Sequence, residues 1–320
     1  MAASEIATDF GLKSILVAYD FSDASRKPLH HASSIARHFG AKLHVAYVVS
    51  SIGYGIAGPE AQQLAYEGSL KDTRRLEGEL LERGELSGVE YEFIVREGDI
   101  WDQLKLVIQE YQIDGVVVGT HARRGLGRLL LGSVAEQIFR QADCAVLTVG
   151  PGSREESLVQ EGGAQPTFVF ATDFSDGSLQ ALPPAAAFAH HFGATLVVLH
   201  ILPAAPIPEG FHWSTTGDLS DMRQQAQVTS QKLFERLIIP RLPASIKPEF
   251  RVSFGRPAEQ ILHTCHTTTV DLLVLGLNPT KHAESGSHLP WVAAHEIVCE
   301  ANCPVLTFKG TSVVNSGVSP

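Results

Sequence analysis

The sequence predicts an α/β fold made of two tandem domains, each a five-stranded parallel sheet flanked by helices. One observation behind this prediction is an internal repeat: residues 15–49 align without gaps with residues 168–202, and 15 of the 35 positions are identical. A second observation is that each copy alternates short, continuously apolar runs with longer segments of helical character. Such apolar runs are typical of strands buried on both faces, and their alternation with helices favours a parallel sheet. We therefore expect the same architecture twice.

The repeat extends to both ends of each copy and sets the predicted domain limits. The turn Asp20-Phe21-Ser22-Asp23 returns as Asp173-Phe174-Ser175-Asp176, and Cys144 before the last apolar run returns as Cys303. Further matching pairs are Gly98 with Gly255, Asp114 with Asp271, and Gly119 with Gly276. We place the first domain at residues 1–150, a polar linker rich in Gly and Glu at 151–166, the second domain at 167–310 and a loose tail at 311–320.

The elements of the first domain follow in a regular order. The run 14–19 predicts the first strand, the turn from Asp20 to Ser22 an N-cap, and 25–39 a helix that ends at Gly40. After a strand over 43–49, the segment 51–63 is rich in turn-forming Gly and Pro and is expected to be mobile. A charged helix over 69–85, a strand over 91–96 and a helix over 99–111 come next. The fourth strand ends at Gly119, and a glycine- and arginine-rich loop, a helix and a fifth strand over 145–149 complete the unit.

Composition excludes several classes of protein. With 44% hydrophobic and 19% charged residues, the chain has the balance of a soluble globular protein. It has no apolar run of the roughly 18 residues that a membrane helix needs, and its N-terminus lacks the order of a secretory signal. The net charge of −10 argues against broad binding to nucleic acid, and the four cysteines are too unevenly spaced for a disulfide framework. We expect a cytoplasmic protein that binds neither membrane nor nucleic acid.

The segment after the fourth strand carries the clearest chemical signal. Gly119 ends an apolar run, and Gly132-Ser133 opens an amphipathic helix. Glycine lets backbone N–H groups approach an anion, and a helix N-terminus adds unpaired donors and a favourable dipole. The segment is neither a Walker loop nor a G-x-G-x-x-G motif. It reads Gly119, two residues, Ala122, nine residues, then Gly132-Ser133.

This spacing resembles the nucleotide loop of the universal stress protein (UspA) family, with Ala122 in place of one glycine. The turn after the first strand resembles that family as well, and the resemblance covers nearly the whole chain. It implies Rossmann-like domains of the adenine nucleotide alpha hydrolase-like type, and binding of ATP or AMP with or without Mg²⁺. It also implies dimerisation, so we expect the two domains to form an intramolecular pseudo-dimer. Further pairing of chains into a homodimer stays open.

The residues of the family's nucleotide site carry over one by one onto the first domain. Ala18, Tyr19 and Asp20 match the adenine and ribose segment, Val48 the base pocket, and Val118 and Gly119 the ribose wall. The expected phosphate residues come from the loop and the helix after it: His121, Ala122, Gly132, Ser133 and Val134. Arg124, with Arg123 and Arg128 beside it, could add positive charge or could belong to a solvated loop.

The second domain departs from this pattern. It keeps Asp173 and Gly276, but counting back from Cys303 puts Trp291-Val292 where the first domain has Gly132-Ser133. A tryptophan at that helix N-terminus would fill the position of a phosphate. We therefore predict that the second domain does not bind ATP in the family manner, and is either a structural partner or a site for a different ligand.

Structural interpretations compete with these functional ones. Asp20 and Asp173 could serve only as helix caps, and Gly119 with Gly132-Ser133 could be only a turn and a helix cap. No metal site is predicted, because the histidines and cysteines lack metal-ligand spacing: His263, Cys265, His266, Cys299 and Cys303. His295 is expected to face solvent. No nucleophile elbow or His–carboxylate arrangement supports catalysis, so the chain is predicted not to be an enzyme, with slow ATP hydrolysis left open.

Two functions therefore remain in competition. The first is a regulatory protein whose first domain binds an adenine nucleotide and thereby changes a surface read by an unknown protein partner. The alternative is a scaffold or partner-binding stress protein with decayed nucleotide sites, which holds another small molecule. Binding of nucleotide to the purified protein distinguishes them.

Overall fold

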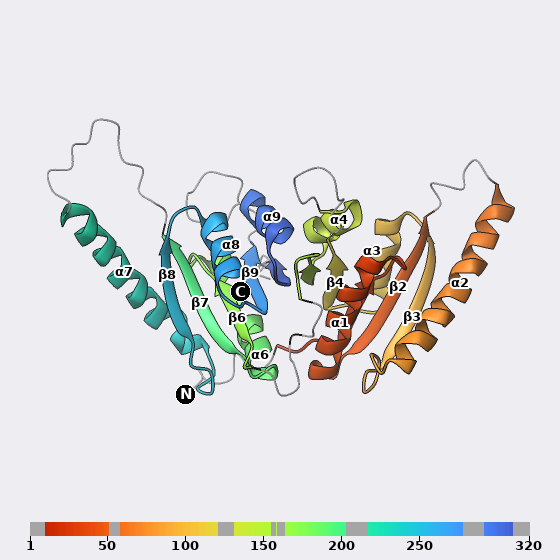
Figure 1. Ribbon diagram of the computed structural model, residues 1–320, viewed down its shortest axis with the longest axis horizontal. Coiled ribbons are helices and arrows are strands. Elements are labelled where there is room, and N and C mark those ends of the chain that lie inside the picture. The colour runs from red at the N-terminus through yellow and green to blue at the C-terminus, as the bar shows by residue number, and fades with distance from the viewer. Residues whose placement is uncertain are drawn as a thin grey trace, which may run out of the picture.

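A computed structural model describes residues 10–50, 58–120, 131–154, 158, 164–202, 217–277 and 291–309. Within these residues the chain forms one ten-stranded sheet in the order β3-β2-β1-β4-β5-β10-β9-β6-β7-β8, with helices on both faces (Figure 1). The predicted α/β fold of two similar five-stranded units is confirmed. No helix among the described residues is both long enough and apolar enough to cross a membrane.

The strands of the two halves match each other in sequence order. Those of the first half are β1 (Ser14–Ala18), β2 (Lys42–Ser50), β3 (Tyr91–Gly98), β4 (Gly115–Gly119) and β5 (Ala145–Val149). Those of the second half are β6 (Thr167–Ala171), β7 (Thr195–Leu202), β8 (Glu249–Phe254), β9 (Leu272–Leu277) and β10 (Val305–Lys309). The central strands are buried along nearly their whole length, as their apolar runs predict.

The helices connect these strands in the same pattern. The first half has α1 (Arg26–Phe39), α2 (Pro59–Glu82), α3 (Ile100–Glu110) and α4 (Ser133–Gln141), with a 3₁₀ turn η1 (Asp23–Ser25) before α1. The second half has α5 (Asp176–Leu179), α6 (Leu182–His191), α7 (Gly217–Leu237), α8 (Pro257–Thr267) and α9 (Trp291–Glu300), with a 3₁₀ turn η3 (Ile239–Arg241). In Figure 1, α2 and α7 lie at the two outer ends of the molecule.

The two halves meet where β5 pairs with β10. All other neighbouring strands are parallel, whereas this pair is antiparallel, with Leu147 opposite Leu306. The threonines beside that pair bond across the junction: Thr148 Oγ1 donates to the Val305 carbonyl at 3.2 Å, and Thr307 Oγ1 to the Val146 carbonyl at 3.2 Å. The strand order reads the same from either end, so the halves are related by an approximate two-fold axis through the junction.

Each face of the sheet has its own set of helices. Helices α1, α2, α6 and α7 contribute to one apolar cluster that is continuous across both halves. Contacts such as Phe39 to Phe188, with ring centroids 4.9 Å apart, join the halves on this face. On the opposite face, the helices α3 and α4 cover the first half and the helices α8 and α9 cover the second. The cavity described below lies on this second face.

The structure corrects two details of the prediction. The charged helix begins at Pro59, ten residues before the predicted start at 69, and takes in residues 59–63 of the segment expected to be mobile. Proline is favoured in the first turn of a helix, and the residues after it are good helix formers, which explains the earlier start. The predicted linker is also partly packed, because Ser153 and Leu158 are 2% and 4% exposed. Residues 311–320 lie outside the described part of the chain.

Candidate functional site

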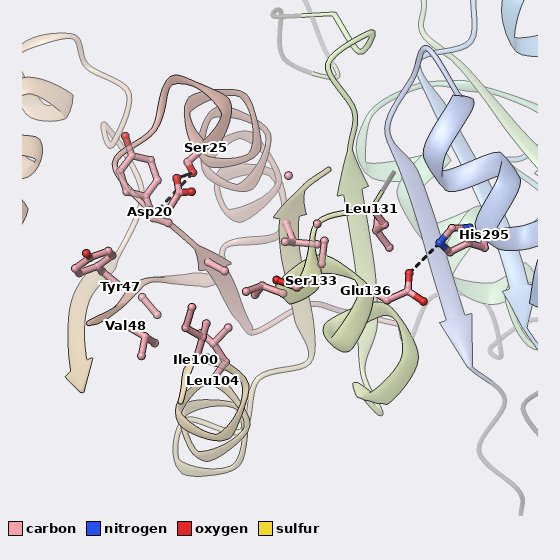
Figure 2. Close-up of a pocket in the computed structure, with 18 residues that line it drawn as sticks. Asp20, Ser25, Tyr47, Val48, Ile100, Leu104, Leu131, Ser133, Glu136 and His295 are labelled. Atoms are coloured by element: carbon pink, nitrogen blue, oxygen red, sulfur yellow. Dashed lines mark hydrogen bonds and ion pairs between the residues drawn. The ribbon is translucent and has the colours of Figure 1, made fainter. Parts of the chain in front are cut away.

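A cavity of about 690 Å³ opens in the first half at the carboxyl ends of β1, β2 and β4, between these strands and the helices α3 and α4 (Figure 2). The structure gathers nine of the sequence-predicted site residues around it: Ala18, Tyr19, Asp20, Val48, Val118, Gly119, Gly132, Ser133 and Val134. The other three, His121, Ala122 and Arg124, lie outside the described residues. Carboxyl ends of parallel strands are the usual place for ligands in such sheets.

One end of the cavity is apolar and is formed by strand ends and helix α3. Val48 forms part of its wall and is 8% exposed, and Val118 is 5% exposed. Ile100 and Leu104 of α3 complete this wall, although the sequence did not single them out. An apolar slot of this kind can accept an aromatic base.

Tyr19 borders the cavity, but its ring packs in the apolar cluster on the other face of the sheet. Its side chain is 5% exposed and belongs to the apolar cluster under α1 and α2, where its ring lies 5.4 Å from that of Phe21. Because strand side chains alternate between faces, Ala18 points to the cavity face and Tyr19 to the other. Tyr19 therefore borders the cavity chiefly with its backbone, whose N–H donates to the Ala46 carbonyl at 2.9 Å.

Asp20 is fixed at the rim of the cavity by its own turn. Its Oδ1 accepts from the Ser22 N–H at 3.0 Å, from the Ser22 hydroxyl at 2.5 Å and from the Ser25 hydroxyl. Phe21 has a φ of +61°, and Phe174 has the same value at the matching turn of the second half. A non-glycine residue rarely adopts this conformation, and hydrogen bonds that the aspartate accepts from the turn stabilise it. The carboxylate thus has a turn-forming role, and its Oδ1 does not cap a helix as predicted.

The N-terminus of α4 faces the middle of the cavity. Its N-cap, Gly132, has an extended ψ of 153° and no side chain to cap the first turn, so the amides of Ser133, Val134 and Ala135 have no partner within the helix. Ser133 is exposed and adds a hydroxyl donor. An uncapped first turn with a positive dipole end can hold an anion.

The second half contributes one residue that the sequence reading placed in solvent. His295, on α9, lines the cavity, and its Nε2 lies 2.9 Å from Oε2 of Glu136 on α4 (Figure 2). The imidazole is 31% exposed and contacts Cys299, whose Sγ lies 3.8 Å from Nδ1. The expectation of a solvent-facing side chain is therefore wrong. His295 stands 159 residues after Glu136, the same offset as Cys303 after Cys144, so the two hold equivalent positions, but that equivalence alone does not predict their contact.

The end of β9 in the second half is packed more tightly than the end of β4 in the first half, on the sheet face opposite the cavity. A Cβ at Gly276 would lie 2.6 Å from the Gly177 carbonyl oxygen and 2.7 Å from Ser178 Cα, so α5 packs directly on the end of β9. At Gly119 the nearest atom to such a Cβ is Pro28 Cγ, at 3.1 Å. Helix α9 begins at Trp291, in register with Gly132, but the Trp291 side chain and residues 278–290 lie outside the described part. That the second half binds no ATP stays a prediction.

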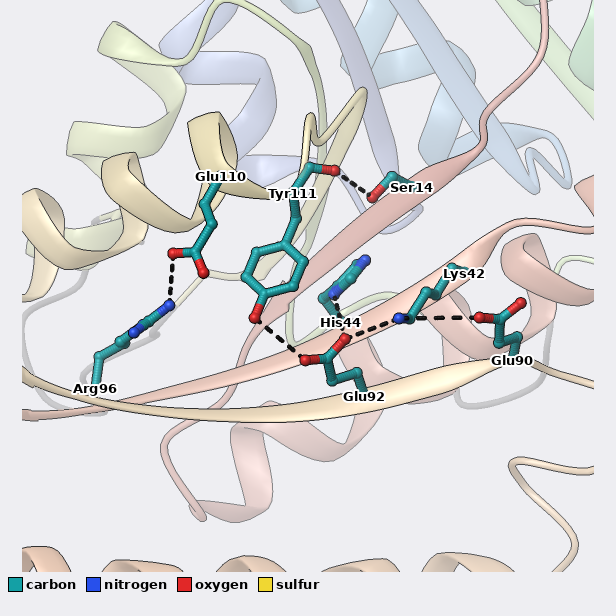
Figure 3. Close-up of polar contacts among 8 residues, drawn as sticks. All are labelled: Ser14, Lys42, His44, Glu90, Glu92, Arg96, Glu110 and Tyr111. Atoms are coloured by element: carbon teal, nitrogen blue, oxygen red, sulfur yellow. Dashed lines mark hydrogen bonds and ion pairs between the residues drawn. The ribbon is translucent and has the colours of Figure 1, made fainter.

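A second cluster of ionisable side chains lies at the opposite, amino-terminal ends of β2 and β3 (Figure 3). Glu92 Oε2 lies 2.8 Å from Lys42 Nζ, and the Tyr111 hydroxyl donates to Glu92 Oε1 at 3.2 Å. The hydrogen bond from Lys42 lowers the pKa of Glu92, and burial lowers the pKa of His44, whose Nδ1 is 3.9 Å from Glu92 Oε2. These contacts tie two strands to the end of α3, which is a structural role.

The cysteines in the described chain are all free thiols. Cys265 and Cys303 have their sulfurs 3.8 Å apart in the core under α8 and α9, and both are at most 2% exposed. Burial raises the pKa of Cys144 to about 11, which disfavours the nucleophilic thiolate. Within the described residues, no group of three or more His, Cys, Asp or Glu side chains has metal-binding geometry.

Comparison with known proteins decides the family. The model of the universal stress protein family matches the chain twice, over residues 11–150 and 166–309. The chain belongs to the universal stress protein family. It is similar to universal stress protein MJ0531 of Methanocaldococcus jannaschii, with 30% identity over 144 residues that make up 45% of this chain and 85% of the relative. A universal stress protein of Thermus aquaticus is 30% identical over 141 residues, covering 43% of this chain and 98% of its own.

Solved structures of tandem length share the fold. A universal stress protein from Archaeoglobus fulgidus aligns over 94% of this chain and 99% of its own, with a TM-score of 0.63 and 17% identity. A protein of unknown function from Pseudomonas aeruginosa aligns over 93% and 92%, with a TM-score of 0.60 and 17% identity. At 17% identity these structures show a shared fold only, which extends over both halves of the chain. The universal stress protein resemblance of the sequence is confirmed.

Proposed function

We propose that the cavity of the first half binds one adenine nucleotide, ATP or AMP, as a regulatory ligand that the protein does not turn over. The observation that carries the proposal is the arrangement of three features in one cavity. An apolar slot for a base, the Asp20 carboxylate for a ribose and the uncapped first turn of α4 for a phosphate all border this cavity. The volume of about 690 Å³ suits a ligand of this size.

The chemistry of each part supports this assignment. Val48 and Val118 would contact the faces of the base, and their burial makes the slot dry enough to favour an aromatic ring. A carboxylate accepts hydrogen bonds from ribose hydroxyls, which gives Asp20 a ligand role beside its turn. The amides at the start of α4 and the Ser133 hydroxyl would donate to phosphate oxygens. The retained loop pattern of the family adds to this reading of the first half.

The decisive experiment identifies the ligand and locates it. Freshly purified protein is denatured and released nucleotide is identified by chromatography and mass spectrometry, and ATP, AMP and adenosine are then titrated into nucleotide-free protein by calorimetry. We expect one adenine nucleotide per chain and no release of phosphate from bound ATP over many binding lifetimes. Two per chain would contradict the assignment to the first half. No bound nucleotide and no binding would refute the proposal and favour the scaffold function.

A matched pair of variants tests the position of the site. Val48→Phe would fill the apolar slot and is expected to weaken nucleotide binding by about tenfold or more, since an added ring cannot be absorbed by a packed wall. Ile201 occupies the repeat position of Val48 in the second half and is equally buried, at 8% exposed. Ile201→Phe therefore introduces a comparable strain elsewhere and should leave the affinity unchanged. Equal effects of the two substitutions would contradict the location.

A further inference from the structure

The contact between Glu136 and His295 lies on the approximate two-fold axis that relates the two halves. The repeat offset of 159 residues, defined by Cys144 and Cys303, makes Glu136 and His295 equivalent positions. The same offset relates Leu147 to Leu306, which the structure pairs directly across the β5–β10 junction. A residue that contacts its own equivalent lies on the axis of a two-fold interface. Both pairs meet this condition, one in the sheet and one at the cavity.

At this position the two halves have diverged in charge. If both halves carried the residue of the first, two carboxylates would face each other at close range and repel. The chain instead places an imidazole opposite the carboxylate, with Nε2 2.9 Å from Oε2. This Oε2 is fully buried and has no hydrogen-bond partner among the described residues, while Oε1 accepts from Arg140. His295 is therefore the group that compensates the buried oxygen of Glu136.

The pair also lies where the phosphate end of a ligand would extend. Figure 2 shows Tyr47 and Val48 at one side of the cavity, Ser133 near its middle, and Glu136 with His295 at the other side. A nucleotide with its base in the apolar slot would lead its phosphates past Ser133 toward this pair. The Glu136 carboxylate alone would repel them, whereas an imidazole with its Nε2 2.9 Å from Oε2 lessens that repulsion. The contact of Cys299 with the ring helps to hold it in place.

We propose that His295 is a ligand-binding residue of the first half's site that the second half supplies. It offsets the charge of Glu136 and favours ligands with an extended phosphate chain over adenosine. The inference rests on the proposed nucleotide function and adds to it a composite site, in which one wall comes from α9. Since α4 and α9 belong to different halves, a phosphate bound at α4 would lie beside His295 and could shift α9 of the second half. The second half then has a role in the site even without a ligand of its own.

The test compares ligands that differ only in phosphate. Calorimetric titrations of ATP, AMP and adenosine are carried out on the full chain and on the variants His295→Gln, Glu136→Gln and the double variant. We expect His295→Gln to weaken ATP binding about tenfold, as loss of one charge-assisted contact allows, and to change adenosine binding by less than twofold. The double variant should recover most of the ATP affinity, because the charge that His295 compensates is gone.

Controls separate this inference from the proposed function and from unfolding. His263→Gln, an exposed histidine on α8 of the same half, should leave all three affinities unchanged. Circular dichroism and melting temperature confirm that each variant is folded. If the wild type binds nucleotide but His295→Gln binds ATP as well as before, or loses ATP and adenosine equally, the inference is refuted and the proposed function stands. If the wild type binds none of the three ligands, both are refuted.

Discussion

His31 allows a stability prediction that can be worked out in numbers. Its side chain is 1% exposed in α1, its Nε2 lies 3.3 Å from the Arg154 carbonyl, and its Nδ1 has no hydrogen-bond partner among the described residues. Protonation would place a charge and a second N–H donor in this buried position. Burial accordingly lowers the pKa of His31 from 6.5 to about 4.

The direction of the pH effect follows from proton binding. Between about pH 6.5 and pH 4 the unfolded chain binds a proton at His31 and the folded chain does not, so the free energy of unfolding falls as the pH falls. The full stability from this residue is present above pH 6.5. The pKa difference corresponds to a loss of about 3 kcal/mol when the pH has dropped below 4. At pH 5 the loss is about 2 kcal/mol relative to pH 7.5.

Substitution by glutamine isolates this contribution. The His31→Gln side chain can still donate an amide N–H to the Arg154 carbonyl but does not titrate. Urea unfolding of both proteins at pH 7.5 and pH 5.0 gives two free-energy differences, and other titrating groups cancel when these are subtracted. We expect the wild type to lose about 2 kcal/mol more than the variant. Parallel losses within about 0.5 kcal/mol would refute the reasoning, because His31 would then titrate alike in both states.

Three further predictions concern packing, backbone hydrogen bonding and thiol chemistry. Gly276→Ala should lower the free energy of unfolding by about 3 kcal/mol, measured in urea, because the new Cβ would lie within 2.7 Å of the α5 backbone. Gly119→Ala should lower it by only about 1 kcal/mol. Equal losses would contradict the difference in packing. Asp114→Ala should lower the free energy of unfolding by about 2 kcal/mol, because the Asp114 carboxylate accepts hydrogen bonds from two backbone N–H groups at the start of β1, at 2.8 and 3.2 Å. An unchanged midpoint of urea unfolding would contradict this. Cys144 should react with iodoacetamide at pH 8 at least about tenfold more slowly in the folded than in the urea-unfolded protein, since burial raises its pKa to about 11.

The repeat and the strand patterns were enough to predict the fold, and the resemblance to the universal stress protein family predicted most of the cavity wall. Nine of the twelve predicted site residues fall in the described chain, and all of them border one cavity, because a parallel sheet brings the ends of β1, β2 and β4 to one edge. Strand alternation would also have shown that Tyr19 points away from Ala18. What the sequence could not indicate is which helix of the second half reaches the cavity. His295 comes from 159 residues beyond its partner, and only the pairing of β5 with β10 brings the two together.

The contacts on the two-fold axis differ in symmetry, which shows what a duplicated chain permits that a dimer of identical chains does not. In the sheet the axis contact is symmetric: Leu147 faces Leu306, and the hydroxyls of Thr148 and Thr307 make the same bond in opposite directions. At the cavity the axis contact is asymmetric, with Glu136 facing His295. In a dimer of identical chains, both contacts would have to be symmetric, because each axis residue faces its own copy. Joining two copies in one chain removes that constraint, and the asymmetric contact lies at the cavity of the first half. The pairing of the halves is thus kept alike while the cavity edge is free to specialise.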